Sequence, residues 1–396
     1  MIDIQKIDEL LTRGVAEVIH LDTLRTKLLA GKPLRVKFGI DPTSPHIHLG
    51  RAVALWKLRD LQDLGHTIVF IIGDFTGVIG DTSDKESERP MLSREVVEQN
   101  LATYFEQAGK ILDMNKVEKH KNTEWLEKLT YREITEHAEA FSLSDFIARE
   151  NIKRRMDRGM RVSLRELLYP LMQGYDSVAV DADIEIGGTD QKFNMLAGRR
   201  LQEHFGKEPQ SILMVDLIEG LDGRKMSSSW GNTVNLTDMP SDMFGKVMSL
   251  RDEFIIKYFV HATHVSPEHL GEVRGALGRG DNPRNLKLDL ATEIVSMYHG
   301  KEEALRTRKG FIATFQKKEV PDDIQEIDMK AGELFSDLLV RAGIVVSKSD
   351  WRRLVDEGAV RRMDGDVEEK ITNHFEVAVN GIYKIGKRRF VKIRAT

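Results

Sequence analysis

The stretch SPHIHLGRAV, residues 44–53, carries two histidines, a glycine and an arginine close together. Imidazole and guanidinium groups both donate hydrogen bonds to phosphate oxygens, so His48 and Arg51 are candidates for a phosphate site. Gly50 has no side chain and lets a nucleotide approach the backbone closely. The alternative is that the histidines cap a helix and that Arg51 is an ordinary surface charge.

A second stretch, DGRKMSSSWGN at residues 222–232, combines Lys225 with three serines on a glycine-flanked segment. A lysine and several hydroxyls on one loop can clamp a phosphate, although such a loop can equally be a solvated linker. Taken together, the two stretches favour transfer of an adenylyl group. That reaction needs a phosphate site on a rigid sheet and a loop that closes on the leaving pyrophosphate.

The residues around the first stretch predict a strand, a helix and a second strand. Residues 34–40 alternate apolar and polar side chains up to a turn at Asp41, and the apolar spacing from Leu49 predicts a helix that stops at Gly65. The run at 67–75 is almost continuously apolar, as in a parallel strand covered on both faces. The first stretch then lies where a strand ends and a helix begins, and an α/β sheet binds anionic ligands at that junction.

The same pattern extends along the chain, and it predicts an α/β fold with smaller domains after it. We expect further strands near 178–188 and 211–218, helices at 124–168 between the halves of the sheet, and helices from 240 to about 314. The polar, charged residues 319–332 predict a linker. The expected domains are an α/β catalytic domain at 1–220 with a helical insertion at about 125–165, a loop at 221–235, a helical domain at 236–325 and a small α+β domain at 331–396.

Composition limits the possible classes of protein. The 396 residues are 41% hydrophobic and 31% charged, which is typical of a globular chain, and no apolar run approaches the ~18 residues that span a bilayer. The chain has no cysteine, which excludes disulfides and thiolate chemistry. The net charge is −4, but residues 331–396 hold 13 Lys+Arg and 10 Asp+Glu, so only this tail is mildly basic. We expect no membrane partner and, because the first residues do not match a secretory or transit signal, a cytoplasmic location.

Several ordered motifs resemble one family. VKFGIDPTSPHIHLGR at 36–51 and KMSSS at 225–229 resemble the two signature motifs of class I aminoacyl-tRNA synthetases, and of the bacterial tyrosyl-tRNA synthetase family in particular. Further matches are GDFTGVIGD at 73–81, KESER at 85–89, LLYPLMQGYDSV at 167–178, IEIGGTDQKFN at 184–194, and a C-terminal stretch similar to an S4 RNA-binding module. The resemblance implies a Rossmann-like catalytic domain, a helical anticodon-side domain and an S4-like domain.

The resemblance also implies a reaction and its partners. Tyrosine is activated with ATP, which carries Mg²⁺, to give tyrosyl adenylate and pyrophosphate, and the tyrosyl group is then transferred to the 3′ end of tRNA-Tyr. A homodimer through the insertion at about 125–165 is implied as well. The chemistry needs positioning and cations aimed at developing charge, and no residue needs to act as a nucleophile.

Individual residues take their roles from the same resemblance. For L-tyrosine, Asp81, Tyr169 and Gln173 match the residues that hold the ammonium, and Asp176 matches the residue that reads the phenolic hydroxyl. The full tyrosine set is Lys37, Gly39, Asp81, Tyr169, Gln173, Asp176 and Gln191; the ATP set is Asp41, His48, Gly50, Gly187, Asp190, Lys225, Met226, Ser227 and Ser228; and the catalytic set is His48, Arg51, Lys225, Lys85 and Arg89. No protein-bound metal site is implied.

Three positions depart from the family pattern. Arg51 replaces the second signature histidine, Ser228 replaces the second lysine of the closing loop, and Lys37 replaces a tyrosine found in many relatives. We hypothesise that Arg51 takes over a phosphate contact. Two alternatives remain: a tryptophan-specific relative, and a non-catalytic RNA-binding protein derived from a synthetase. The tyrosine-type residues 169, 173 and 176 argue against both.

Overall fold

The computed structural model describes residues 3–81, 91–317, 324–330, 332–364, 367–386 and 389–395. The chain packs into two compact units, residues 1–237 with 250–280, and residues 238–249 with 281–396. The helical segment expected at 236–325 is therefore shared between the two units. In the described part of the chain, no helix is long and apolar enough to cross a membrane.

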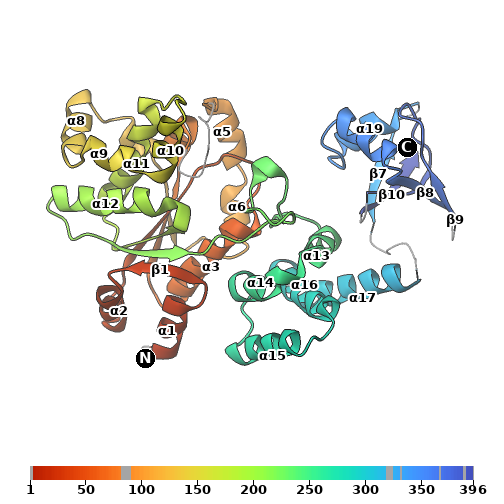
Figure 1. The fold of residues 1–396 in the computed structure, drawn as a ribbon, viewed down its shortest axis with the longest axis horizontal. Coiled ribbons are helices and arrows are strands. Elements are labelled where there is room, and N and C mark those ends of the chain that lie inside the picture. The colour runs from red at the N-terminus through yellow and green to blue at the C-terminus, as the bar shows by residue number, and fades with distance from the viewer. Residues whose placement is uncertain are drawn as a thin grey trace. The chain divides into compact units, whose positions relative to one another are not determined.

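A six-stranded sheet forms the centre of the first unit (Figure 1). Its order is β1-β6-β5-β2-β3-β4, and only the edge pair β1–β6 is antiparallel. The strands are β1 Val15–Ile19, β2 Arg35–Ile40, β3 Thr67–Ile72, β4 Val117–Lys121, β5 Ile184–Gly188 and β6 Ser211–Val215. The central strands are apolar because helices cover them, so the predicted α/β class is confirmed.

The predicted crossover between the first two parallel strands is confirmed. Helix α3 (Leu49–Asp63) connects β2 to β3 and buries Leu55, Leu58 and Leu61. Its end follows the expected pattern, because Gly65 has a φ of +91°, which glycine adopts without strain.

Helices surround this sheet, and α11 packs along α12. Their bounds in the first unit are α1 Ile4–Thr12, α2 Leu21–Leu29, α4 Asp74–Ile79, α5 Arg94–Leu101, α6 Tyr104–Ala108, α7 Thr123–Leu126, α8 Tyr131–Glu139, α9 Leu143–Ile147, α10 Glu150–Asp157, α11 Leu164–Ala179, α12 Lys192–His204, α14 Ile255–Ala262 and α15 Pro267–Gly278, with short 3₁₀ turns η1 Thr189–Gln191, η2 Ser228–Trp230 and η3 Asp252–Phe254. Arg155 of α10 and Glu166 at the start of α11 form a buried ion pair, with 2.5 Å between Nη1 and Oε2, and this pair joins the two helices.

The second unit contains a helical part and a small α+β part. The helices are α13 Pro240–Met248, α16 Pro283–His299 and α17 Lys301–Lys317. The α+β part has a five-stranded sheet in the order β7-β11-β10-β8-β9, with helices α18 Phe335–Arg341 and α19 Lys348–Asp356. Its strands are β7 Gln325–Met329, β8 Val360–Asp364, β9 Val367–Lys370, β10 Gly381–Ile385 and β11 Arg389–Ala395. Phe335, Trp351 and Tyr383 form an aromatic core in it.

Several element boundaries differ from the sequence predictions. The strand expected at 178–188 begins only at Ile184, because α11 continues to Ala179. The strand expected at 67–75 ends at Ile72, and Asp74 starts α4. The predicted linker at 319–332 is wrong in part, because 325–329 pair in parallel with β11 as strand β7. Strands β1 and β4 were not predicted at all.

Candidate active site

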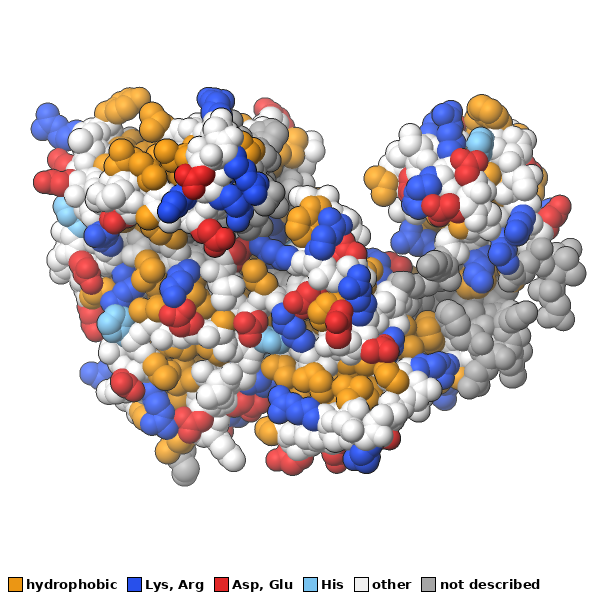
Figure 2. All heavy atoms as spheres, in the orientation of Figure 1, with side chains coloured by type: hydrophobic (Ala, Val, Ile, Leu, Met, Phe, Trp, Pro, Cys, Tyr) orange, Lys and Arg blue, Asp and Glu red, His pale blue; other side chains and the backbone are white. Residues whose placement is uncertain are grey.

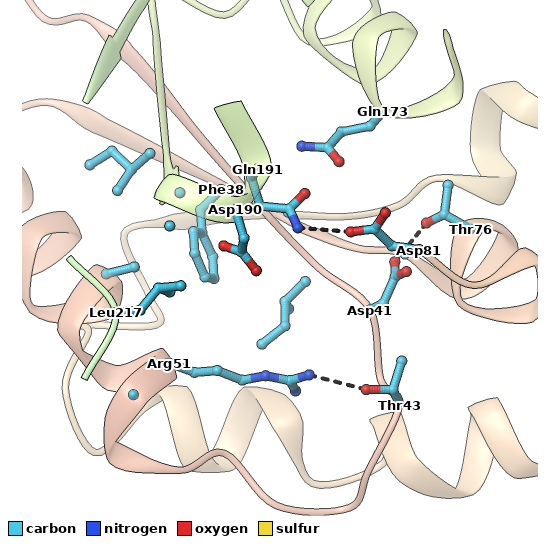
Figure 3. Close-up of a pocket in the computed structure, with 18 of the residues that line it drawn as sticks. Phe38, Asp41, Thr43, Arg51, Thr76, Asp81, Gln173, Asp190, Gln191 and Leu217 are labelled. Carbon is cyan, nitrogen blue, oxygen red and sulfur yellow. Dashed lines mark hydrogen bonds between the residues drawn. The ribbon is translucent and has the colours of Figure 1, made fainter. Parts of the chain in front are cut away.

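One pocket of about 450 Å³ opens at the carboxyl ends of the parallel strands in the first unit. Residues that follow β2, β3, β4 and β5 line it together with α11 and the loop after β6 (Figure 3). The predicted site residues that line it are Gly39, Asp41, His48, Gly50, Arg51, Asp81, Tyr169, Gln173, Asp176, Gly187, Asp190, Gln191, Lys225, Met226, Ser227 and Ser228. Lys85 and Arg89 lie outside the described residues.

Lys37 is the one described residue of the predicted site that does not line the pocket. Its side chain is fully buried, and its ammonium lies 2.9 Å from a carboxylate oxygen of Glu185. The same ammonium donates to the Gln173 carbonyl and to the Ser177 hydroxyl, each at 2.8 Å. A buried ammonium needs acceptors, and Lys37 finds them in the protein itself, so its contact with tyrosine stays a prediction.

A buried carboxylate forms one wall of the pocket. Asp176 accepts a hydrogen bond of 2.7 Å from the Trp125 indole and one of 3.4 Å from the Asn122 amide. Burial raises the pKa of Asp176 to about 7, although Lys37 and the two hydrogen bonds act in the opposite direction. Asp176 can therefore accept a hydrogen bond from a buried hydroxyl or, when protonated, donate one.

Two further carboxylates have neutral hydrogen-bond partners. Asp41 accepts from the Tyr169 hydroxyl and from the Thr76 hydroxyl, each at 2.8 Å. Asp81 accepts from the Gln191 amide at 2.8 Å, and Figure 3 shows the Asp81 and Gln191 side chains pointing toward each other. Burial and the nearby Asp41 raise the pKa of Tyr169 well above its usual value, so its hydroxyl stays a donor.

His48 lies at the start of α3 and is almost fully buried. Its side chain makes no capping hydrogen bond, so the interpretation of the histidines as helix caps is wrong for this residue. Burial lowers the pKa of His48 to about 3, and the positive charges of Arg51 and Lys225 add to the effect. Neutral His48 has a buried Nδ1 that finds no hydrogen-bond partner within the described residues. Such an unsatisfied polar atom beside a pocket is typical of a binding site.

Gly50 allows close packing at the same corner. A Cβ at Gly50 would lie 3.1 Å from His48 Nδ1 and 3.4 Å from Met226 Cβ, which is too tight for a larger side chain without movement. The Gly50 amide donates to the Met226 sulfur at 3.3 Å, and the Leu49 amide donates to the Val234 carbonyl at 2.8 Å. These two amides at the helix start already have acceptors, so the contribution of the helix N-terminus to anion binding is smaller than expected.

Arg51 points along the pocket and is held by neutral groups. Its guanidinium donates to the Tyr104 hydroxyl at 2.9 Å and, as Figure 3 shows, to the Thr43 hydroxyl at 3.1 Å. The Tyr104 hydroxyl in turn donates to the Ser44 carbonyl at 2.5 Å. Among the described residues, no carboxylate forms an ion pair with Arg51. Its charge is thus oriented without being neutralised, and a planar guanidinium suits phosphate oxygens.

The second signature stretch also reaches the pocket. Lys225 forms an ion pair of 2.7 Å with Asp190, and the Ser228 hydroxyl lies 3.0 Å from the Ser44 hydroxyl of the loop after β2. These two contacts bind the segment to the rim of the pocket. The alternative interpretation, a solvated linker, is therefore wrong.

Sequence reasoning missed several residues that line the pocket or contact the side chains that line it. Asn122 and Trp125 follow β4, whose sequence VEKHK is too polar to be recognised as a strand. Thr76 lies inside the motif GDFTGVIGD, but its bond to Asp41 depends on α4 replacing the expected strand end. Tyr104 contacts Arg51 from 53 positions along the chain, and no local pattern signals that contact.

A largely parallel α/β sheet whose strand ends open on a pocket with oriented cations and a serine-rich loop at its rim is the architecture of a nucleotide-binding enzyme, as in the class I synthetases. A model of the family "tRNA synthetases class I (W and Y)" matches residues 29–316. The chain belongs to this family, and the resemblance seen in its motifs is confirmed.

The chain is similar over its full length to curated relatives. The tyrosine–tRNA ligase of Coxiella burnetii is 42% identical over 100% of both chains, and that of Thermotoga maritima is 43% identical over 97% of this chain and 96% of its own. The solved Archaeoglobus fulgidus tyrosyl-tRNA synthetase, a complex with L-tyrosine, covers 77% of this chain and 100% of its own with a TM-score of 0.61 at 23% identity. This last similarity supports the fold alone.

The pKa of Asp176 leads to a prediction about pH. If the ionised carboxylate accepts the hydroxyl of the substrate, kcat/KM for tyrosine should rise as pH increases, with a midpoint near the pKa of about 7. Asp176→Asn should remove this rise and lower kcat/KM, measured as the tyrosine-dependent exchange of pyrophosphate into ATP across the pH range.

Thermal unfolding provides the control for this variant. Folding raises the pKa of Asp176 from 3.8 to about 7. Ionisation of this carboxyl therefore lowers the stability of the folded state, and this loss grows as pH rises between those two values. Asp176→Asn should consequently be no less stable than the parent above pH 7, so a loss of activity is not a loss of folding. A pH profile of the parent that is flat through this range would contradict the assignment.

Proposed function

We propose that this chain is a tyrosine–tRNA ligase that works through the pocket at the carboxyl ends of the strands. The observation that carries the proposal is that one pocket combines Asp176, a buried partner for a phenolic hydroxyl, with Arg51, a cation that donates to two neutral hydroxyls. The first group selects tyrosine, and the second attracts the phosphates of ATP. The full-length similarity to tyrosine–tRNA ligases supports the same assignment.

Tyrosine binds with its ring toward Asp176 and its ammonium among acceptors. Asp81, the Gln173 amide oxygen and the Tyr169 hydroxyl oxygen accept from the ammonium. The Tyr169 hydroxyl is held in place because it donates to Asp41. Gly39 lines the pocket without a side chain and leaves room for the ring. Gln191, held by Asp81, faces the reacting carboxylate.

ATP binds on the side of the two signature stretches. Asp41 and Asp190 accept from ribose hydroxyls, and Gly187 and Gly50 leave the backbone accessible. The tyrosine carboxylate attacks the α-phosphorus and pyrophosphate leaves. Arg51, Lys225 and the neutral His48 donate to the oxygens on which negative charge develops. Lys225 must exchange its Asp190 partner for a phosphate as the segment of Met226, Ser227 and Ser228 closes.

Magnesium enters this proposal only as the companion of ATP. Among the described residues, no group of three or more His, Cys, Asp or Glu could hold a metal ion. An ion that arrives with ATP would offset part of the negative charge of the phosphates. The acceptor is the 3′-terminal ribose of tRNA-Tyr, the α+β part of the second unit is the S4-like RNA-binding domain, and the cytoplasm is the expected location.

Exchange of labelled pyrophosphate into ATP tests this function. Tyrosine alone among the amino acids should support rapid exchange, and tRNA-Tyr should then accept the tyrosyl group. Tryptophan-dependent exchange would indicate the tryptophan-specific relative. Binding of tRNA without any exchange would indicate a non-catalytic RNA-binding protein.

Arg51 should act mainly on adenylate formation. Arg51→Ala should slow the single-turnover rate about 10²- to 10³-fold, the usual effect of losing one preorganised donor in the transition state, with tyrosine affinity nearly unchanged. Arg51→His should also lose activity, and adding Ser228→Lys should restore part of it.

Arg59→Ala is the matched control for this series. Arg59 lies on the same helix but forms a surface ion pair with Asp63 at 2.9 Å and does not line the pocket. Its removal should leave the rate unchanged. If Arg51→Ala behaves like Arg59→Ala, Arg51 is a surface charge after all.

A homodimer through the helical insertion is part of the proposal. Figure 2 shows hydrophobic side chains gathered over the surface where α8–α11 lie. The large exposed apolar residues of the insertion include Leu143, Met156, Met160 and Leu164, and Leu164 is 77% exposed. A contiguous apolar surface of this kind is typical of an interface.

Sedimentation at micromolar concentration should therefore give a dimer. Leu164→Arg should shift it toward monomer, because a charge would be buried without a partner. Leu21→Arg, on α2 outside the insertion, should leave the dimer intact. A monomeric parent protein would remove this part of the proposal.

A further inference from the structure

An exposed tryptophan stands beside the mouth of the pocket. Trp230 ends η2, and the three serines directly before it, 227–229, line the pocket, whereas Trp230 does not. The side chain is 46% exposed, although tryptophan is highly buried on average. The indole is therefore presented outside the pocket, next to the segment that closes it.

A chain of contacts fixes this indole. The Arg224 guanidinium carbon lies 4.6 Å from the Trp230 ring centroid, which is a cation–π contact. Arg224 donates to one Asp222 oxygen at 2.8 and 2.5 Å, and Asn232 donates to the other at 2.7 Å. The ring is thus oriented before any ligand arrives, which lowers the entropic cost of binding.

A second arginine contacts the same aspartate. Arg251 donates to the Asp222 carbonyl at 3.1 Å. The side chains of Arg224 and Arg251 are 58% and 61% exposed, and each forms a surface ion pair, Arg224 with Asp222 and Arg251 with Glu253 at 3.6 Å, so both guanidinium groups stay accessible to solvent. An exposed aromatic face beside permanent positive charges is the combination that binds single-stranded nucleic acid, in which a base stacks and the backbone phosphates meet the cations.

We propose that Trp230, Arg224 and Arg251 form a stacking platform for an unpaired nucleotide near the 3′ end of the tRNA. The proposal rests on the proposed function, because the terminal ribose must enter the pocket to receive the tyrosyl group. The nucleotides that precede it then lie at the mouth, where the platform is. ATP is not the occupant, since the residues assigned to ATP line the pocket and Trp230 does not.

Two assays on the full-length protein separate the platform from the activation step. Trp230→Ala should raise KM for tRNA roughly tenfold to a hundredfold, the usual effect of losing one stacked base, and should leave tyrosine-dependent pyrophosphate exchange within about twofold of the parent. Trp230→Phe keeps an aromatic face and should retain most of the tRNA affinity. Leu21→Ala, at a residue that is 45% exposed on α2, should change neither assay.

The arginines predict a salt dependence. The variant Arg224→Gln/Arg251→Gln should reduce the slope of log KM for tRNA against log salt, because fewer counterions are released on binding. An unchanged KM for tRNA in Trp230→Ala would overturn the platform, as would a loss of exchange as large as the loss of transfer. Absence of tyrosine-dependent exchange in the parent protein would instead overturn the proposed function.

Discussion

The buried ion pair between Lys37 and Glu185 is the interaction on which the pocket depends. The two residues are register partners on the neighbouring strands β2 and β5, and the Lys37 ammonium also donates to the Gln173 carbonyl and the Ser177 hydroxyl of α11. One ammonium therefore joins two strands to the helix that carries Tyr169, Gln173 and Asp176. Removing one partner of such a pair leaves an uncompensated buried charge and typically costs about 3–5 kcal/mol.

The pocket has acceptor groups on one side and cations on the other. On the side of α11, the carboxylates meet hydroxyl, amide and indole donors, which leaves them able to accept from a substrate hydroxyl or ammonium. On the side of α3, the described hydrogen-bond partners of the Arg51 guanidinium are hydroxyls, and Lys225 forms an ion pair with Asp190. A cation that is oriented without being neutralised attracts phosphate more strongly than one already in an ion pair. The proposal that Arg51 takes over a phosphate contact rests on this difference.

The sequence predicts those parts of the fold and the site whose residues are consecutive along the chain. The strand–helix–strand unit around residues 34–75 and the two signature stretches could be predicted, because their turns, glycines and apolar spacing are consecutive. The pairing of Lys37 with Glu185, 148 positions away, could not be predicted, because a buried ion pair leaves no local pattern in the sequence. Strand β7 was hidden for a similar reason, since QEIDM becomes a strand only by pairing with β11.

The dissociation constant of tyrosine across a double-mutant cycle at positions 37 and 185 tests most directly whether this pair supports the pocket. Lys37→Met should weaken tyrosine binding about tenfold or more, because Glu185 is left charged and unpaired beside the site. Adding Glu185→Gln should recover part of that loss, which corresponds to a coupling energy of about 1–3 kcal/mol. If Lys37→Met leaves the dissociation constant unchanged, or if the two losses simply add, the ion pair does not hold the tyrosine site in place.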